Sequence, residues 1–295
     1  MGTVHWGGIS GETFLSGLIV RKSPVLKFHW DSGDVMVKKA ITTLKVLKTL
    51  RSNMRLKTSE WVQIQEEKFK GLLTHAYDNV PFYRRLLDDA GLTPKDISDY
   101  GDISRIPITT RSQFQKAGKD TIAKNADIWV ERKTSGSTGI RLSLFFSMED
   151  ALYSRGTYER ARVENGFKIL RDVLLYVGNP SIIPNSKRWH EPLGIRRKEG
   201  ISVFDPLEAQ IRKLEEVKPD VVWGYASSIR LMGEAIGDGG RRRVLPRLIF
   251  TASELLDRKT RSVINSAFDV DLFDVYVAEE AGCLAWECQN IQVII

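Results

Sequence analysis

Strand-like and helix-like segments alternate through the second half of the chain, and this alternation constrains the fold more than any other feature. Short apolar runs at 173–177, 221–223 and 248–250 have the length of buried strands. Helical spacing or helix-start signals occur at 207–217, from about 228 and at 257–267, and a last strand is expected over 270–277. Because parallel strands need crossover segments of this kind, the pattern predicts an α/β fold with a parallel or mixed sheet flanked by helices.

The clearest single element is the helix expected after residue 205. Asp205 is a predicted N-cap, Pro206 suits the first helical position, and Glu208 completes the start signal. The apolar residues of one helical face are Leu207, Ile211, Leu214 and Val217. This spacing predicts a helix that packs on a core through one side.

The segment before residue 130 is predicted to be mainly helical. One helix is expected to begin at Thr58 and to end near Pro81. A short helix over 84–90 should stop near Gly91, and another should begin near Arg111.

Two further strands are expected in the middle of the chain, over 128–130 and 142–146. Ser147 and Asp150, three residues apart, form a capping-box pattern for a helix that follows the second strand. A strand is therefore predicted to lead directly into a helix.

Positive charge gathers in residues 1–55, and the whole chain has a formal net charge of +7. We interpret this segment as a basic N-terminal leader or helix. A solvated helical face is the simplest explanation, and a surface for acidic membranes or nucleic acid is the alternative. No reading helix or stacking motif predicts specific nucleic-acid binding. The basic residues are Lys38, Lys39, Lys45, Lys48, Arg51 and Arg55.

The sequence predicts a cytoplasmic protein. No apolar run approaches the ~18 to 20 residues of a membrane span, and the N-terminus lacks the pattern of a secretory signal. Cys283 and Cys288 are the only cysteines, which excludes a disulfide framework. A zinc site would need further ligands, such as His190, and buried free cysteines are the commoner alternative.

The most informative motif is the segment KTSGSTG at 133–139. Glycines let backbone N–H groups approach phosphate oxygens closely, and the Ser and Thr hydroxyls donate further hydrogen bonds. The composition therefore suits a triphosphate-binding loop, with a flexible surface turn as the alternative. The loop is not a Walker A motif, because the pattern G-x-x-x-x-G-K-[ST] is absent.

The segment TSGSTG at 134–139 resembles the signature phosphate loop of adenylate-forming enzymes. Flanking segments narrow the resemblance to the phenylacetate–CoA ligase and CapK-like branch: HAYDNVPFY at 75–83, KPDVVWGYASS at 218–228, TASE at 251–254 and DVYVAEEAG at 274–282. The resemblance covers about 56–288. It implies that 56–295 forms the large N-terminal domain of these enzymes, incomplete, with the small C-terminal domain absent and the chain truncated.

The resemblance also implies roles for individual residues. The ATP phosphates would be held by Thr134, Ser135, Gly136, Ser137, Thr138 and Gly139. The adenine pocket would be lined by Ala252, Ser253 and Glu254, with Tyr276 against the adenine ring. The acceptor pocket would include Trp223, Gly224, Tyr225 and Ser227. Glu280 would bind magnesium, and Thr138 and Glu280 would be the catalytic residues.

Each of these roles has a structural alternative. Tyr276 lies in an apolar strand and could be core, and Trp223 and Tyr225 could be packing residues. Glu280 could be a surface carboxylate beside Glu279.

The sequence departs from the family pattern at the end of the last motif. The family usually has Tyr-Gly-x-[ST]-Glu, whereas Val277 replaces the glycine and Glu279 replaces the hydroxyl residue. Ile140 and Arg141 also stand where Lys-Pro often follows the phosphate loop. A valine in place of glycine hinders close approach of the backbone to AMP. A glutamate in place of a hydroxyl residue removes a hydrogen-bond donor to the AMP phosphate.

The resemblance implies an enzyme that uses ATP and Mg²⁺ to convert a small carboxylic acid into its acyl-AMP. Coenzyme A is one acceptor, and a deazaflavin that receives AMP directly is another. Capsular polysaccharide synthesis is a further context of this branch. A truncated nucleotide-binding relative without turnover is the competing hypothesis, and a homodimer is an arrangement that the sequence leaves open.

Overall fold

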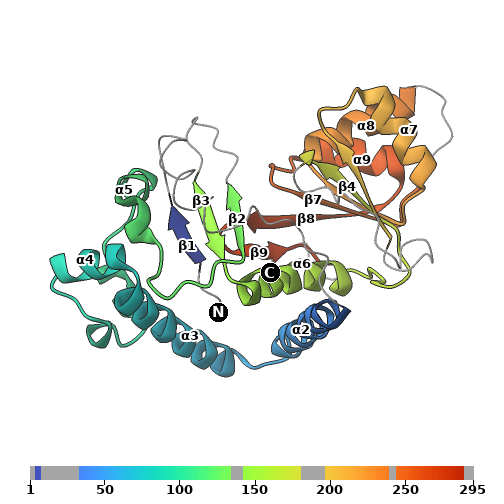
Figure 1. Ribbon diagram of the computed structural model, residues 1–295. Coiled ribbons are helices and arrows are strands. Elements are labelled where there is room, and N and C mark those ends of the chain that lie inside the picture. The colour runs from blue at the N-terminus through green and yellow to red at the C-terminus, as the bar shows by residue number, and fades with distance from the viewer. Residues whose placement is uncertain (1–3, 8–32, 134–141, 181–196, 239–243, 289–295) are drawn as a thin grey trace. The chain divides into compact units, whose positions relative to one another are not determined.

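The computed structural model describes residues 4–7, 33–133, 142–180, 197–238 and 244–288 (Figure 1). The chain divides into two compact units. The first unit is Met1–Thr157 with Glu279–Ala281, and the second unit is Tyr158–Ala278 with Gly282–Ile295. None of the helices in the described ranges combines the length and hydrophobicity needed to cross a bilayer.

Helices make up most of the described first unit. They are α2 (Gly33–Asn53), α3 (Thr58–Asn79), α4 (Pro81–Asp89) and α5 (Arg111–Ala117), with short 3-10 helices at Pro94–Asp96, Tyr100–Arg105 and Gly118–Thr121. The starts predicted at Thr58 and Arg111 are confirmed, and Thr110 caps α5 through a reciprocal capping box with Gln113. The short helix predicted from residue 84 begins earlier, because Pro81 takes its first position.

A three-stranded antiparallel sheet completes the first unit. Its strands are β1 (Val4–Gly7), β2 (Val130–Lys133) and β3 (Ser143–Phe146), in the order β1-β3-β2. The strand predicted at 128–130 instead starts at its last residue, because the cross-strand ladder to β3 begins there. The predicted capping box is confirmed: the Asp150 N–H donates to the Ser147 hydroxyl oxygen at 3.1 Å, the Ser147 N–H donates to Asp150 Oδ2 at 3.2 Å, and α6 (Met148–Glu164) follows.

A six-stranded sheet forms the centre of the second unit, in the order β5-β4-β6-β7-β8-β9. The strands β4 (Leu174–Gly178), β5 (Lys198–Ser202), β6 (Val221–Gly224), β7 (Leu248–Ala252) and β8 (Asp271–Ala278) are parallel, and β9 (Gly282–Trp286) pairs antiparallel with β8. The helices α7 (Leu207–Val217), α8 (Ala226–Asp238) and α9 (Arg258–Phe268) alternate with them. The predicted α/β fold with a mixed sheet is confirmed.

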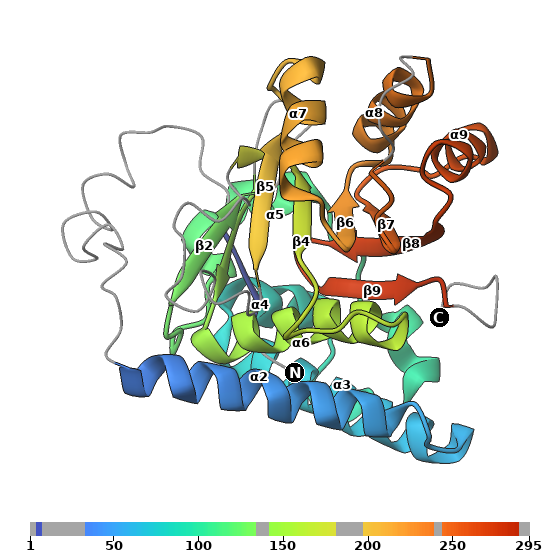
Figure 2. The same cartoon turned by 90° about the vertical axis from the view of Figure 1, so that its right-hand side faces the viewer.

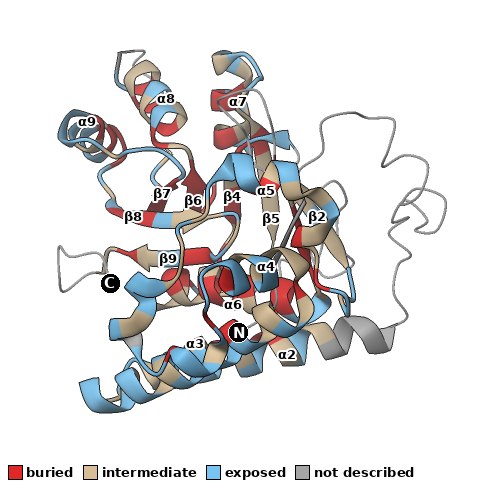
Figure 3. Ribbon diagram, turned by 90° about the vertical axis from the view of Figure 1, so that its left-hand side faces the viewer, coloured by how far each residue is buried: buried red, intermediate tan, exposed pale blue. Residues whose placement is uncertain are grey.

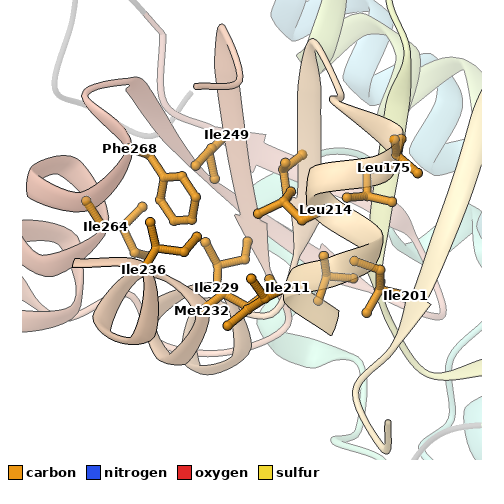
Figure 4. Close-up of a cluster of buried hydrophobic side chains, with 14 of the residues drawn as sticks. Leu175, Ile201, Ile211, Leu214, Ile229, Met232, Ile236, Ile249, Ile264 and Phe268 are labelled. Carbon is orange, nitrogen blue, oxygen red and sulfur yellow. The ribbon is translucent and has the colours of Figure 1, made fainter. Parts of the chain in front are cut away.

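Both faces of this sheet are buried. On one face, which the helices α7, α8 and α9 cover (Figure 2), Leu175, Val222 and Ile249 pack against Ile211 of α7 and Phe268 of α9 (Figure 4). The next residue of each strand faces the opposite core, which includes Ala161 of α6 and Trp286 of β9. Strands covered on both sides need apolar residues at successive positions, which explains the continuous apolar runs of the sequence.

The start of α7 differs in one detail from the sequence prediction. Pro206, with ψ of 141°, is the N-cap, so Asp205 lies one residue before it. The Asp205 backbone carbonyl instead accepts from the Gln210 side chain at 2.8 Å. The predicted apolar face is confirmed, since Ile211, Leu214 and Val217 are buried.

Candidate functional site

The predicted site residues of the second unit gather where three parallel strands end. The strands β6, β7 and β8 are neighbours and end at Gly224, Ala252 and Ala278. Carboxyl ends of parallel strands meet at one edge of a sheet, where α/β proteins commonly bind ligands. This edge presents the loop after β6, the loop after β7 and the end of β8, and we call it the carboxyl edge.

A hydrogen bond connects two of these loops. The backbone N–H of Ser227, in the first turn of α8, donates to Glu254 Oε2 at 2.9 Å. The first N–H groups of a helix have no partner within the helix, and its N-terminus favours negative charge. Glu254 therefore caps α8 from a position 27 residues further along the chain.

The loop after β7 contains strained backbone. Ser253 has φ of +70°, a conformation that costs energy for any residue with a Cβ atom. The other described non-glycine residues with positive φ are Lys218 and Asp269, and both are C-caps of helices. Ser253 is thus the one described case away from a helix end, and it lies at the carboxyl edge.

Tyr276 is exposed at this edge. Ala252 pairs with Val275, so Tyr276 stands one residue beyond that pair, level with the Ser253 loop. Its side chain is 63% exposed, so the alternative that Tyr276 is a core residue is wrong. An exposed ring beside a strained loop can stack against a planar ligand.

Polar residues support the strand that carries Tyr276. Asp274 Oδ1 accepts from the Thr251 hydroxyl at 2.8 Å across β7 and β8. Arg261 of α9 donates to both Glu287 oxygens, at 2.6 and 2.7 Å, and the Asp274 N–H donates to Glu287. Burial, and then the Glu287 charge, raise the pKa of Asp274. No role was predicted for Arg261 or Glu287, because their pairing joins residues that are distant along the chain.

Trp223 and Gly224 are packed tightly at the end of β6. The Trp223 side chain is 8% exposed and stacks on Phe250, with ring centroids 5.5 Å apart. A Cβ atom on Gly224 would lie 2.5 Å from the backbone oxygen of Val177. Close packing therefore explains the residue type at both positions. For Trp223 this agrees with the alternative that it is a packing residue. Their roles toward a substrate stay predictions.

Comparisons with known proteins find partial similarity to coenzyme A ligases. No family model matches the chain. Phenylacetate-coenzyme A ligase of Thermus thermophilus is 46% identical over 52 residues, which are 18% of this chain and 12% of that protein. The enzyme of the same name from Escherichia coli is 37% identical over 78 residues, 26% of this chain and 18% of that protein.

Solved structures extend the similarity along the chain. An open conformation of 2-hydroxyisobutyryl-CoA ligase in complex with 2-HIB-AMP and CoA gives a TM-score of 0.64 at 16% identity, over 79% of this chain and 58% of that chain. The thioesterification state of that ligase gives a TM-score of 0.63, over 79% of this chain and 53% of that chain. The chain has the fold of adenylate-forming ligases and resembles the phenylacetate–CoA ligase branch. The matches span less than two thirds of each of these relatives, and less than a fifth of the two phenylacetate-coenzyme A ligases.

The segment that the sequence analysis assigns to a phosphate loop, Thr134–Gly139 with Ser135, Ser137 and Thr138, lies outside the described residues, and its role stays a prediction. The strands on either side of the loop are described. Lys133 of β2 pairs with Ser143 of β3, so the two ends of the loop are fixed side by side.

Glu280, for which the sequence analysis predicts a role as magnesium ligand, lies in the turn between β8 and β9. Its neighbour Glu279 pairs with Arg132 at 3.8 Å, whereas Glu280 makes no ion pair within the described part of the chain. No group of three or more potential metal ligands occurs among the described residues. A single half-buried carboxylate fits Mg²⁺ when the nucleotide phosphates supply the other oxygens.

Val277 replaces the glycine that adenylate-forming ligases usually have after the tyrosine. The backbone does not require glycine here, since Val277 is not among the described residues with positive φ. Its partly buried side chain packs against the core that contains Trp286, and the pairing of β8 with β9 shifts register between Tyr276 and Val277.

Cys283 and Cys288 form no disulfide in the structure. Cys283 is buried, and burial raises the pKa of its thiol to about 11. His190, the third residue of the zinc alternative, lies outside the described residues. The geometry of Cys283 agrees with the buried-thiol alternative.

Proposed function

We propose that this chain takes part in the ATP-dependent adenylation of a carboxylic acid, followed by transfer of the acyl group to coenzyme A. The observation that carries the proposal is the exposed Tyr276 ring, level with the strained Ser253 loop and next to the Glu254 cap of α8. Similarity to phenylacetate–CoA ligases, and to a ligase solved with an acyl-AMP and CoA, supports the acid and the acceptor.

In the proposed reaction, a carboxylate oxygen of the acid attacks the α-phosphorus of ATP. The bond between this phosphorus and the oxygen that bridges to the β-phosphate breaks, and pyrophosphate leaves with the bonding electrons. The thiol of coenzyme A then attacks the acyl carbon and releases AMP. Such chemistry depends mainly on positioning and on stabilising negative charge.

The residues have separate tasks in this proposal. Ser135–Gly139 would bind the phosphates, and Tyr276 would stack on adenine while Ala252, Ser253 and Glu254 line its edge. Gly224, Tyr225 and Ser227 would line the acceptor pocket, with buried Trp223 behind them. Glu280 would hold Mg²⁺, which neutralises phosphate charge when bound.

The cytoplasm is the compartment that we propose, because Cys283 and Cys288 form no disulfide and a reducing compartment keeps cysteines as thiols.

Nucleotide binding without turnover is the second candidate function. It is favoured by Val277 and Glu279, which replace a glycine and a hydroxyl residue of the family pattern. A hydrogen bond to the phosphate of AMP would be missing in that case.

Calorimetry with ATP and with AMP, in the presence and absence of Mg²⁺, tests the proposal on the 295-residue chain. Tyr276→Ala should weaken AMP binding by ~1–3 kcal/mol, the usual contribution of stacking on one base. Ser137→Ala with Thr138→Ala should weaken ATP more than AMP, because ATP has two further phosphates.

Phe204→Ala is the matched control, since Phe204 is an aromatic residue that is 75% exposed in the loop after β5. Equal AMP affinity in the native chain and in Tyr276→Ala would refute the assignment. Exchange of labelled pyrophosphate into ATP, screened with aryl and acyl acids, then separates adenylation from binding without turnover.

A further inference from the structure

The helix α2 presents a cationic and apolar face that the proposed reaction does not use. None of the residues assigned to nucleotide, metal or substrate lies on α2 (Gly33–Asn53). The helix belongs to the first unit. A role for this face is therefore independent of the proposed function.

One side of α2 is committed to packing. Thr43, Leu47 and Leu50 are buried, at 7%, 7% and 5% exposure. Val46 meets α6 so closely that a Cβ atom on Gly156 would lie 2.4 Å from Val46 Cγ1. The helix is thus anchored on the first unit by this side, and its opposite side has a fixed direction.

The opposite side, which we call the outer face, consists of Ile41, Leu44, Lys45, Lys48 and Arg51. These positions are three, four, seven and ten residues after the first, so they follow one another along a single helical face. All five are exposed; the large aliphatic side chains Ile41 and Leu44 keep 47% and 58% of their surface in solvent. In Figure 3 exposed residues recur along the part of α2 whose burial is described.

The charge of this region has one sign. Residues 38–57 contain seven basic and no acidic residues: Lys38, Lys39, Lys45, Lys48, Arg51, Arg55 and Lys57. The neighbouring helix α3 (Thr58–Asn79) carries charges of both signs, among them Glu60, Glu66, Lys68 and Lys70. Solubility alone does not require charges of a single sign on a helix, because charges of both signs are equally well hydrated and can form stabilising pairs on its surface.

We propose that the outer face of α2 docks this chain on an anionic lipid bilayer. A helix that lies in the membrane interface buries aliphatic side chains at the boundary of headgroups and acyl chains, while cations on it meet lipid phosphates. Ile41 and Leu44 supply the first contact, and Lys45, Lys48 and Arg51 the second. Nucleic acid is the less suitable partner, because aliphatic side chains at the centre of the face add nothing to phosphate binding.

Sedimentation of the 295-residue chain with large unilamellar vesicles tests the proposal. Vesicles of phosphatidylcholine mixed with phosphatidylglycerol are compared with pure phosphatidylcholine, at about 50 mM and about 200 mM salt. Binding to the anionic vesicles should exceed binding to the neutral ones and should weaken at the higher salt concentration. Equal binding to both vesicles, or none to either, would overturn the proposal.

Two double variants separate charge from apolar insertion. Lys45→Glu with Lys48→Glu should reduce partitioning into anionic vesicles by roughly fivefold or more per lysine. Ile41→Ser with Leu44→Ser should reduce the binding that remains at about 200 mM salt, where attraction between charges is screened. Far-UV circular dichroism verifies that each variant is folded.

Matched controls make the same kinds of substitution at exposed positions outside α2. Lys116→Glu with Lys259→Glu gives the same net charge from two exposed positions on α5 and α9. Ile108→Ser with Leu245→Ser removes two aliphatic residues that are 89% and 55% exposed. Both controls should bind vesicles like the native chain, and equal losses in a control and an α2 variant would refute a specific face.

Fluorescence anisotropy with a short DNA duplex decides between the two anionic partners. The proposal expects weaker binding to DNA than to anionic vesicles at equal phosphate concentration and equal salt. Tighter binding to DNA, lost in Lys45→Glu with Lys48→Glu, would overturn the proposal in favour of nucleic acid.

Discussion

The two units obtain their stability from differently sized cores. In the second unit, apolar side chains fill both faces of a six-stranded sheet, and strand residues such as Leu174, Leu175 and Phe250 are completely buried. In the first unit, the described cores are smaller and lie apart: one joins α3 and α4 around Leu87, and another lies under the three-stranded sheet around Leu144. Burial is thus concentrated in the second unit, and a substitution should cost more there.

The two units also differ in how far their ion pairs are buried. In the second unit, Glu159 and Arg162 pair at 3.3 Å with side chains that are only 2% and 4% exposed. In the first unit, Arg85 and Asp120 pair at 2.6 Å, and their side chains remain 56% and 48% exposed. The shorter pair is the weaker contributor, because water screens exposed charges and already solvates them when the pair is broken.

The largest expected effect comes from the buried pair. Arg162→Met should destabilise the chain by ~3–5 kcal/mol, because buried Glu159 then loses its closer cation and keeps the Lys198 ammonium at 3.7 Å. Arg162 also donates to the Tyr176 hydroxyl at 2.8 Å, and that bond is lost as well. Burial alone would lower the pKa of Arg162, but Glu159 and Tyr176 raise it, so the guanidinium stays charged.

Urea unfolding followed by circular dichroism measures this effect, with Arg85→Met in the first unit as the matched control. The control should cost less than ~1 kcal/mol. Equal costs for the two variants would break the comparison between the units. Glu159→Gln combined with Arg162→Met should recover part of the loss, since no buried carboxylate is then left without its guanidinium.

The next effect concerns two glycines that occupy different surroundings. Gly224→Ala should destabilise the second unit by ~1–3 kcal/mol, because the new Cβ would lie 2.5 Å from the Val177 backbone oxygen and the two parallel strands must separate. Gly71→Ala, within α3, should instead stabilise by ~0.5–1 kcal/mol, since nothing lies within 4 Å and alanine favours a helix.

Urea titration of both variants gives the two signs directly. A neutral Gly224→Ala would show that β4 and β6 can shift apart at little cost. A destabilising Gly71→Ala would show that α3 in the first unit is more tightly enclosed than the structure indicates.

Most of the elements followed from local signals. The helices that begin at Thr58 and Arg111, and the apolar face of α7, depend on capping residues and spacing within a few positions. The strands β4, β6 and β7 were visible as apolar runs because both sides of each strand are buried, whereas β5 and β9 were not predicted. Boundaries moved where a proline or a neighbouring strand set them, as at Pro81 and Val130.

The candidate site was only partly predictable. Tyr276, Glu254 and Ser227 were identified through a family resemblance, but the capping of α8 by Glu254 joins residues 27 positions apart. The burial of Trp223 depends on Phe250 and Tyr158, which reach it from another strand and from α6. Local patterns carry no information on such pairings, because these depend on which segments the fold brings together.

The smallest effect compares one carboxylate from each unit by its dependence on pH. In the first unit, the backbone N–H and hydroxyl of Ser98, together with Arg105, lower the pKa of Asp102 from 3.8 to about 2. In the second unit, burial and then the Glu287 charge raise the pKa of Asp274 above 3.8, against the hydrogen bond from Thr251. The two groups should therefore respond to acid with opposite signs.

The stabilisation from Asp102 is present above pH 3.8 and is lost as the pH falls toward about 2. The contribution from Asp274 is present below pH 3.8 and is lost as the pH rises through its raised pKa. Asp102→Asn should thus lower the urea midpoint at neutral pH and have a much smaller effect near pH 2, where about half of the native carboxylate is protonated. Asp274→Asn, which can still accept from Thr251, should raise the midpoint at neutral pH and change it less at acid pH.

Asp271→Asn, at the exposed start of β8, controls for the change of net charge. If Asp102→Asn and Asp274→Asn shifted the midpoint in the same direction at neutral pH, the contrast between a solvated and an enclosed carboxylate would be wrong. Opposite shifts would show that enclosing the Asp274 carboxylate costs stability. The large cores of the second unit offset this cost, whereas the smaller core clusters of the first unit have no such cost to offset.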